Sequence, residues 1–275
     1  MVYSETKMSI IDKKRKKVRI HDFLEMKKKG VKISAITCYD ASFARLIELS
    51  KMDIVLVGDS LGNVIQGKNS TLPVTVKQMS YHIKCVRNSL QTPLLIGDMP
   101  FLSVGISIKE TMENAGLLMQ SGAEAVKIEG ATSEICEQIN HLTRHGIPVM
   151  GHIGLMPQSV HALGGYKIQG KNESDKKRLL KEAKLLQNAG CFAIVLELIT
   201  PNLAEELSKA LKIPTIGIGS GNHCDGNILV LQDMLGMNKN FKPKFLKHYL
   251  ELEESIVHSL DNYCNDVVNK ISENE

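Results

Sequence analysis

The chain has 275 residues, of which 43% are hydrophobic and 23% are charged. This composition is too apolar for a disordered chain and is typical of a globular protein with a large core. The formal charge of +4 is concentrated at the start, because residues 1–20 carry a net charge of +5 and the rest of the chain a net charge of −1. The nearly neutral body does not favour nucleic-acid binding, which would have to depend on the first residues alone.

The basic run Lys13–Lys17 belongs to residues 1–20, which we interpret as a flexible leader. No aromatic side chain that could stack on a base is interleaved with this run. The chain also lacks the apolar segment of a signal peptide and any stretch of about 18 apolar residues. We therefore expect a cytoplasmic protein that does not enter a membrane.

After the leader, residues 22–29 predict a helix that ends before Gly30 and is placed to close one end of a barrel. From residue 33 onward, short apolar runs alternate with longer segments of helical periodicity, as in strand–helix–strand units. The runs are continuous rather than alternating, as expected for strands that are covered on both faces. The predicted strands are Ile33–Thr37, Ile54–Val57, Leu94–Ile96, Ala125–Ile128, Pro148–Met150, Ala193–Leu196, Thr215–Ile218 and Ile228–Leu231. The predicted helices between them are Ala41–Ser50, Val76–Ser89, Ile108–Gln120, Ser133–His145, Glu173–Ala189 and Leu203–Leu211.

Eight strands favour a closed (β/α)8 TIM barrel, which would form a single domain over residues 21–275. Residues 58–75 exceed the length of a tight turn and predict an elaborated loop over the active face. The segment between the seventh and eighth strands is too short for a full helix, so an open doubly wound sheet stays an alternative. Apolar stripes between Phe245 and Ile271 predict one or two C-terminal helices that pack on the core or on a neighbouring subunit.

Five consecutive predicted strands finish in a carboxylate or an imidazole. In chain order these residues are Asp59, Asp98, Glu129, His152 and Glu197. All strands of a parallel barrel point their carboxyl ends to the same face, so we expect these side chains to meet there. Acidic side chains are costly to bury unless they are paired or bound to metal. The ring therefore predicts Mg²⁺ or another divalent ion that prefers oxygen ligands.

Lys127 lies two residues before Glu129, so both side chains should point into the barrel. We interpret this lysine as a partner for an anionic substrate, with charge balance inside the protein as the alternative. Taken singly, the other residues also have plainer interpretations. Asp59 or Asp98 would serve as a cap of the following segment, and His152 as a hydrogen-bonded structural histidine.

Nine segments at and around these positions carry a resemblance to a known family. They are ITCYD (36–40), LVGDSLG (56–62), STLPVTV (70–76), GDMPF (97–101), AVKIEG (125–130), GHIGLMPQSV (151–160), GGYKIQG (164–170), IGIGSG (216–221) and DGNILVLQD (225–233). Through them, roughly residues 20–250 resemble the ketopantoate hydroxymethyltransferases. The resemblance implies a (β/α)8 barrel that uses Mg²⁺ and assembles as a homodecamer.

The same resemblance implies roles for individual residues. The implied metal ligands are Asp59, Asp98 and Glu129, and the implied keto-acid-binding residues are Asp59, Ser60, Asp98 and Lys127. Glu197 would be the general base, and His152 would line or orient the site. The implied reaction moves a hydroxymethyl group from 5,10-methylenetetrahydrofolate to 3-methyl-2-oxobutanoate. The product is 2-dehydropantoate, a precursor of pantothenate and coenzyme A.

Two other functions stay open at this point. A Mg²⁺-dependent carbon–carbon lyase or mutase of the phosphoenolpyruvate mutase and isocitrate lyase type would also act on a keto-acid enolate. Such an enzyme would normally call for a catalytic cysteine loop or a phosphonate site, and the sequence shows neither. The alternative from a different class is a nucleic-acid-binding or scaffold protein that uses the basic leader.

Overall fold

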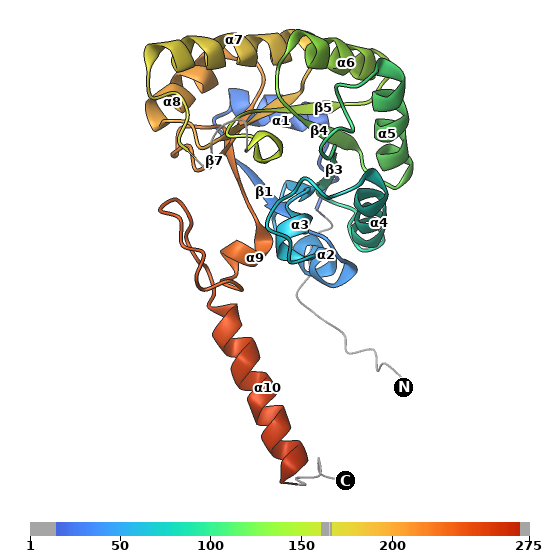
Figure 1. The fold of residues 1–275 in the computed structure, drawn as a ribbon, viewed down its shortest axis with the longest axis vertical. Coiled ribbons are helices and arrows are strands. Elements are labelled where there is room, and N and C mark those ends of the chain that lie inside the picture. Colours follow the sequence, from blue (N-terminus) through green and yellow to red (C-terminus); the bar gives the residue numbers. More distant parts are fainter. Residues whose placement is uncertain (1–14, 161–164, 166, 270–275) are drawn as a thin grey trace. The chain divides into compact units, whose positions relative to one another are not determined.

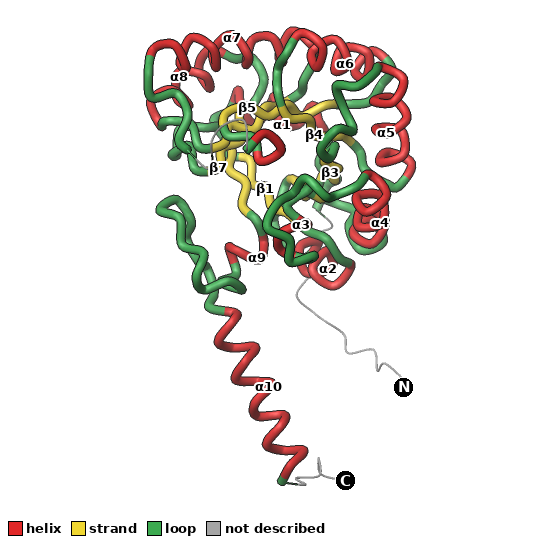
Figure 2. Tube along the Cα trace, in the orientation of Figure 1, coloured by secondary structure: helices red, strands yellow, loops and turns green. Residues whose placement is uncertain are grey.

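The computed structural model describes residues 15–160, 165 and 167–269, and it contains a closed barrel of eight parallel strands (Figures 1 and 2). Each strand pairs with the next in chain order, and the barrel closes between the last and the first. The strands are β1 (Ile33–Thr37), β2 (Ile54–Val57), β3 (Leu94–Asp98), β4 (Ala125–Glu129), β5 (Val149–Gly154), β6 (Ala193–Glu197), β7 (Thr215–Ile218) and β8 (Gly226–Leu229). The predicted (β/α)8 fold is confirmed, and the open-sheet alternative is wrong.

Helices cover the outside of the barrel, where α4 to α8 follow one another around the strands (Figure 1). The helices are α1 (Ile20–Lys28), α2 (Ala41–Glu48), α3 (Leu61–Val64), α4 (Val76–Arg87), α5 (Ile108–Gln120), α6 (Ser133–Arg144), α7 (Glu173–Ala189), α8 (Pro201–Ala210), α9 (Leu231–Met234) and α10 (Leu252–Val268). Side-chain caps start several of them, as where Asp40 accepts hydrogen bonds from the backbone N–H groups of Ser42 and Phe43. None of the described helices combines the length and the apolar character that a membrane span requires.

The apolar core inside the barrel lies toward the amino ends of the strands. It includes Ile33, Ile54 and Leu94, the first residues of β1, β2 and β3, and α1 adds Phe23 to the same cluster. Phe23 stacks on Phe192, with ring centroids 6.2 Å apart. The predicted N-terminal helix therefore closes the amino end of the barrel, which leaves the carboxyl ends open to a site.

The segment before α1 is packed against the barrel from Arg15 onward. Arg15 pairs with Asp53 at 2.5 Å, and Lys17 pairs with Glu124 at 2.6 Å. Packing thus begins before residue 21, where the sequence predicts the barrel domain to start, because these two cations find acidic partners on it. Residues 1–14 of the predicted leader lie outside the described residues.

The chain falls into two compact units, Met1–Ile228 and Leu229–Glu275, whereas the sequence predicts one domain over residues 21–275. In the second unit, the backbone N–H of Tyr249 donates to the carbonyl of Met234, which ties the segment before α10 to α9. α10 itself has no buried side chain, although its sequence carries apolar stripes. The stripes predicted a helix correctly, but they did not show what it packs against.

Candidate active site

The structure brings the predicted site residues together at the carboxyl ends of adjoining strands. Asp98, Glu129 and Glu197 are the last residues of β3, β4 and β6, Asp59 follows β2 by two residues, and His152 lies within β5. The strand register sets Asp98 beside Lys127 and Glu129 beside His152. We call these residues together with Lys127 the acidic cluster.

Lys127 is the central cation of the acidic cluster. Its Nζ atom lies 2.9 Å from Asp98 Oδ1, 3.6 Å from Glu129 Oε1 and 3.3 Å from His152 Nδ1. Burial by itself would lower the pKa of this lysine, but the surrounding carboxylates raise that pKa above its usual value. Lys127 is therefore a charged ammonium group in the interior of the barrel.

The carboxyl groups around Lys127 have pKa values above those usual for aspartate and glutamate side chains. Burial raises the pKa of Asp98 well above its usual value, although Lys127 opposes the shift. Burial raises the pKa of Glu129 against the same opposition. For Glu197, burial raises the pKa to about 8. Glu197 thus exchanges its proton near neutral pH, which is the range in which a general base is effective.

His152 connects Glu197 to the rest of the cluster. Burial and the neighbouring Lys127 ammonium lower the pKa of this histidine to about 4, so its ring is neutral at pH 7. Nδ1 faces the donor Lys127, while Nε2 lies 3.3 Å from Glu197 Oε2. The tautomer that accepts from Lys127 at Nδ1 carries its proton on Nε2. Nε2 makes no hydrogen bond with the described residues, so His152 lies beside Glu197 with a buried donor left unpaired.

Two residues of the site were missed in the sequence. Tyr39 is buried after β1, and its hydroxyl group lies 2.8 Å from the hydroxyl group of Ser60. Gln158 follows β5 and donates a hydrogen bond from Nε2 to Asp59 Oδ2 at 2.9 Å. Both stand in loops directly after barrel strands, and this position is the signal that would have identified them.

Backbone geometry brings β5 and β6 close together beside Glu197. Gly154 has a φ of +101°, and a Cβ atom added to it would lie 2.2 Å from the carbonyl oxygen of Glu197. Leu198 also has a positive φ of 46°, and its backbone N–H donates to the carbonyl of Ile218. Glu197 is therefore followed by a strained turn that the neighbouring strands hold in place.

The predicted metal ligands Asp59, Asp98 and Glu129 are brought to one end of the barrel. Among the described residues, however, no three His, Cys, Asp or Glu side chains converge closely enough to form a ready-made metal site. The Lys127 ammonium contacts both Asp98 and Glu129. Their donor chemistry still fits Mg²⁺, because hard carboxylate oxygens outnumber the single lysine.

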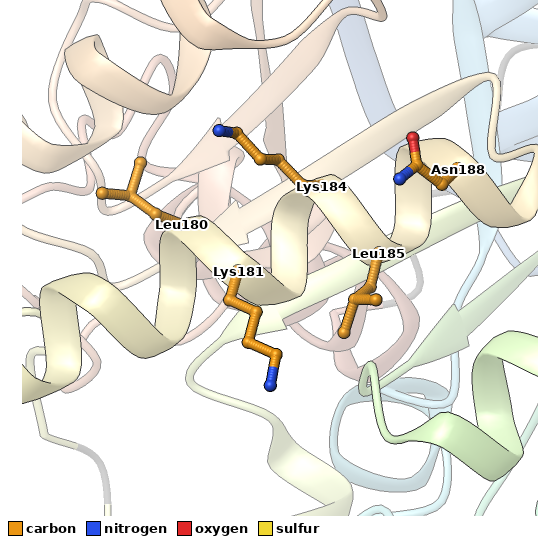
Figure 3. A pocket seen from close by; sticks show the side chains of 5 residues that line it. All are labelled: Leu180, Lys181, Lys184, Leu185 and Asn188. Carbon is orange, nitrogen blue, oxygen red and sulfur yellow. The ribbon is translucent and has the colours of Figure 1, made fainter.

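A shallow groove of about 330 Å³ lies elsewhere, on the outer surface of α7 (Figure 3). Its lining residues are Leu180, Lys181, Lys184, Leu185 and Asn188. All belong to one helix, and the two lysines extend in different directions (Figure 3). Leu179, Ala183 and Leu186, on the other face of α7, are buried. This groove holds no converging functional groups, so the acidic cluster is the candidate active site.

Known proteins resemble the chain in sequence and in fold. The 3-methyl-2-oxobutanoate hydroxymethyltransferase of Thermosipho africanus is 49% identical over 251 residues, which cover 91% of this chain and 94% of that protein. Phosphonopyruvate hydrolase, solved with oxalate and Mg²⁺, aligns at a TM-score of 0.58 with 12% identity, over 78% of this chain and 80% of its own.

A second solved structure is 2,3-dimethylmalate lyase, a member of the PEP mutase/isocitrate lyase superfamily. It aligns at a TM-score of 0.57 with 14% identity, over 91% of this chain and 98% of its own. At such low identity, the two structures show only a shared barrel fold. The predicted lyase or mutase alternative is therefore matched in fold and not in activity. The family model for ketopantoate hydroxymethyltransferase matches residues 17–271. Because this match spans most of the chain and is supported by a relative of high identity, the chain belongs to the ketopantoate hydroxymethyltransferase family.

Proposed function

We propose that the chain transfers a hydroxymethyl group from 5,10-methylenetetrahydrofolate to 3-methyl-2-oxobutanoate, which gives 2-dehydropantoate. Family membership supports the keto acid and the transferred group. The observation that carries the proposal is Glu197, a carboxyl group with its pKa raised to about 8 by burial, beside a cluster that also holds a buried cation. This arrangement suits the removal of a weakly acidic proton from an anionic substrate.

In the proposed reaction, Lys127 attracts the carboxylate of the keto acid into the cluster. Ser60 would supply a hydroxyl group to the same substrate, and Tyr39 holds that hydroxyl group at 2.8 Å. Asp59 and Asp98 would complete the binding site.

Glu197 then removes the proton from C3 of the keto acid. The C3–H electron pair becomes part of an enolate, and the proton is bound by the Glu197 carboxylate, which lies 3.3 Å from Nε2 of the neutral His152. The enolate carbon attacks the one-carbon unit of the folate and forms the new carbon–carbon bond, while one of the two carbon–nitrogen bonds of that unit breaks and its nitrogen takes up a proton. Water then replaces the second folate nitrogen on this carbon, which leaves the hydroxymethyl group on the product and releases tetrahydrofolate.

Asp59, Asp98 and Glu129 would hold Mg²⁺ in this proposal. When bound, the ion supplies a Lewis acid for the keto oxygen. The excess of carboxylates over the single Lys127 ammonium supports a cation at this position.

The deciding experiment is an assay of 2-dehydropantoate formation from the two substrates, with and without Mg²⁺, followed by mass spectrometry. We expect product only with the complete mixture, and none with a Glu197→Gln variant. Absence of product from the wild-type chain with Mg²⁺ present would contradict the proposal.

We also expect the chain to form a homodecamer. The apolar side chains that α10 exposes, among them Leu260 and Val267, support contacts with further copies of the chain. Light scattering coupled to size-exclusion chromatography should give ten times the mass of one chain. A monomeric mass at micromolar concentration would contradict this expectation.

A further inference from the structure

Gln158 lies across the ends of three barrel strands. It belongs to the 3₁₀ turn Pro157–Ser159 after β5, and its Nε2 atom donates both to Asp59 Oδ2 at 2.9 Å and to the carbonyl of Met99 at 3.0 Å. Its backbone N–H donates to Glu129 Oε2 at 3.2 Å. One residue of the loop after β5 thus contacts groups at the carboxyl ends of β2, β3 and β4.

These contacts determine the orientation of the Gln158 amide. Its two N–H groups face two acceptors, a carboxylate oxygen of Asp59 and the carbonyl oxygen of Met99. A flipped amide would place its own oxygen against both acceptors, so the observed orientation is the one that the hydrogen bonds support. The amide is therefore a fixed donor to Asp59.

The same contacts act on one oxygen of each of two acidic residues. Gln158 engages Oδ2 of Asp59 and Oε2 of Glu129, whereas Oε1 of Glu129 faces Lys127 and His152 inside the cluster. Each of the two carboxylates thus accepts a hydrogen bond from a neutral donor of Gln158. Hydrogen bonds of this kind orient the ligands of metal ions and increase their affinity.

We propose that Gln158 is a positioning residue whose side-chain amide orients the carboxylate of Asp59 for a divalent cation, while its backbone N–H, which side-chain substitutions keep, contacts Glu129. The inference rests on the proposed function, which supplies Mg²⁺ as the cation. Gln158 acts by donating hydrogen bonds and not by filling space. Its removal therefore weakens metal binding even where the volume of the side chain is kept.

The test is a calorimetric titration of the metal-free protein with Mg²⁺. Gln158→Ala and Gln158→Met should both bind Mg²⁺ about tenfold more weakly than the wild type, since methionine keeps the length of the side chain but has no N–H donor. The matched control is Gln187→Ala, because Gln187 accepts a hydrogen bond from the backbone of Lys212 on the outer helical layer. That control should bind Mg²⁺ as the wild type does. The metal-free variants should unfold at the wild-type temperature.

A second measurement separates positioning from a structural role. In the product assay, the Mg²⁺ concentration for half-maximal rate should rise about tenfold in Gln158→Met, while kcat at saturating Mg²⁺ should return close to the wild-type value. If Gln158→Met bound Mg²⁺ as tightly as the wild type or more tightly, the role of Gln158 would be wrong. The proposed metal site would stand, because the wild type would still bind the ion. A wild-type protein that binds no Mg²⁺ would overturn both the inference and the metal site of the proposed function.

Discussion

The acidic residues of the site lie in two different electrostatic environments. Asp98 forms a close buried pair with Lys127, and its side chain is 2% exposed. Glu197 faces a neutral imidazole instead, and 18% of its side chain is exposed. The Lys127 ammonium opposes the rise in pKa that burial causes at Asp98, whereas Glu197 contacts a neutral ring and, with its pKa raised to about 8, is placed to gain and lose a proton.

The role of Glu197 as base can be tested without the folate. A Glu197→Gln variant should bind Mg²⁺ like the wild type but should lose exchange of the C3 proton of 3-methyl-2-oxobutanoate in heavy water, which proton NMR follows. The expected loss is at least a hundredfold, the usual contribution of a general base. Glu205→Gln is a suitable control, since Glu205 pairs with Lys209 on the surface of α8. Wild-type exchange in Glu197→Gln would show that another group removes the proton.

The pKa of Glu197 also predicts how stability depends on pH. Burial raises this pKa from its usual 4.5 to about 8, so the folded protein keeps a proton that the unfolded chain loses. The stabilising contribution is therefore complete below pH 4.5 and is lost as the pH rises through about 8. Urea unfolding of the metal-free protein between pH 6.5 and 9 should show a steeper fall in stability for the wild type than for Glu197→Gln. Equal slopes would mean that Glu197 has an ordinary pKa.

At the scale of the elements, the position of a site residue depends on how two neighbouring strands pack together. Gly154 is an example, because its positive φ and the nearby Glu197 carbonyl leave no room for a side chain where β5 meets β6. The backbone N–H of Leu155 then donates to the same carbonyl at 2.8 Å. The position of Glu197, the proposed base, therefore depends on a glycine in the neighbouring strand.

A Gly154→Ala variant should lose about 3 kcal/mol of unfolding free energy, from backbone strain and from overlap with Glu197. Gly105→Ala is the matched control: its φ is +95°, but no atom lies within 4 Å of an added Cβ. It should lose about 1 kcal/mol, the cost of strain alone. Urea denaturation measures both, and equal losses would show that the contact with Glu197 is unimportant.

The elements also show how far the sequence could predict the structure. The first seven strands start within one residue of their predicted positions, because continuous apolar runs are specific for covered strands. The third strand continues to Asp98, beyond its predicted end at Ile96, since backbone pairing with β4 does not require an apolar side chain. The eighth starts at Gly226 and not at Ile228, because the strand passes so close to the Ile33 carbonyl that a Cβ atom would lie 2.3 Å from it.

The candidate site could likewise be predicted only in part from the sequence. The acidic cluster could be predicted because each member is a charged or polar residue within two residues of the carboxyl end of an apolar strand. For Gln158, the position after β5 could mark the residue as a candidate but could not predict its contacts with Asp59 and Glu129, which depend on the path of a turn across three strands. The placement of Lys127 between carboxylates likewise depends on strand register, which the sequence does not specify.

At the scale of the whole barrel, stability and chemistry lie at opposite ends. Phe23 is buried in the core at the amino ends of the strands, whereas the acidic cluster lies at the carboxyl ends. Changes at the closed end should therefore affect folding without changing the chemistry.

Phe23→Ala should reduce the unfolding free energy by about 3 kcal/mol, because it leaves a cavity beside Phe192. Below its melting temperature, the variant should exchange the C3 proton at the wild-type rate. Phe241→Ala is the control, since Phe241 is 45% exposed and its removal should cost less than about 0.5 kcal/mol. An exchange rate that falls together with stability would show that the two ends are coupled.

The position of Lys127 among the carboxylates has a consequence for how the protein matures. Many metal sites are clusters of like charges that repel one another until the ion arrives, and such proteins fold only as they are loaded. Here the ammonium group already offsets part of that repulsion, because it contacts both Asp98 and Glu129. The chain can thus complete its barrel before the proposed Mg²⁺ ion binds, so the metal-free protein should already be folded and ready to take up the ion.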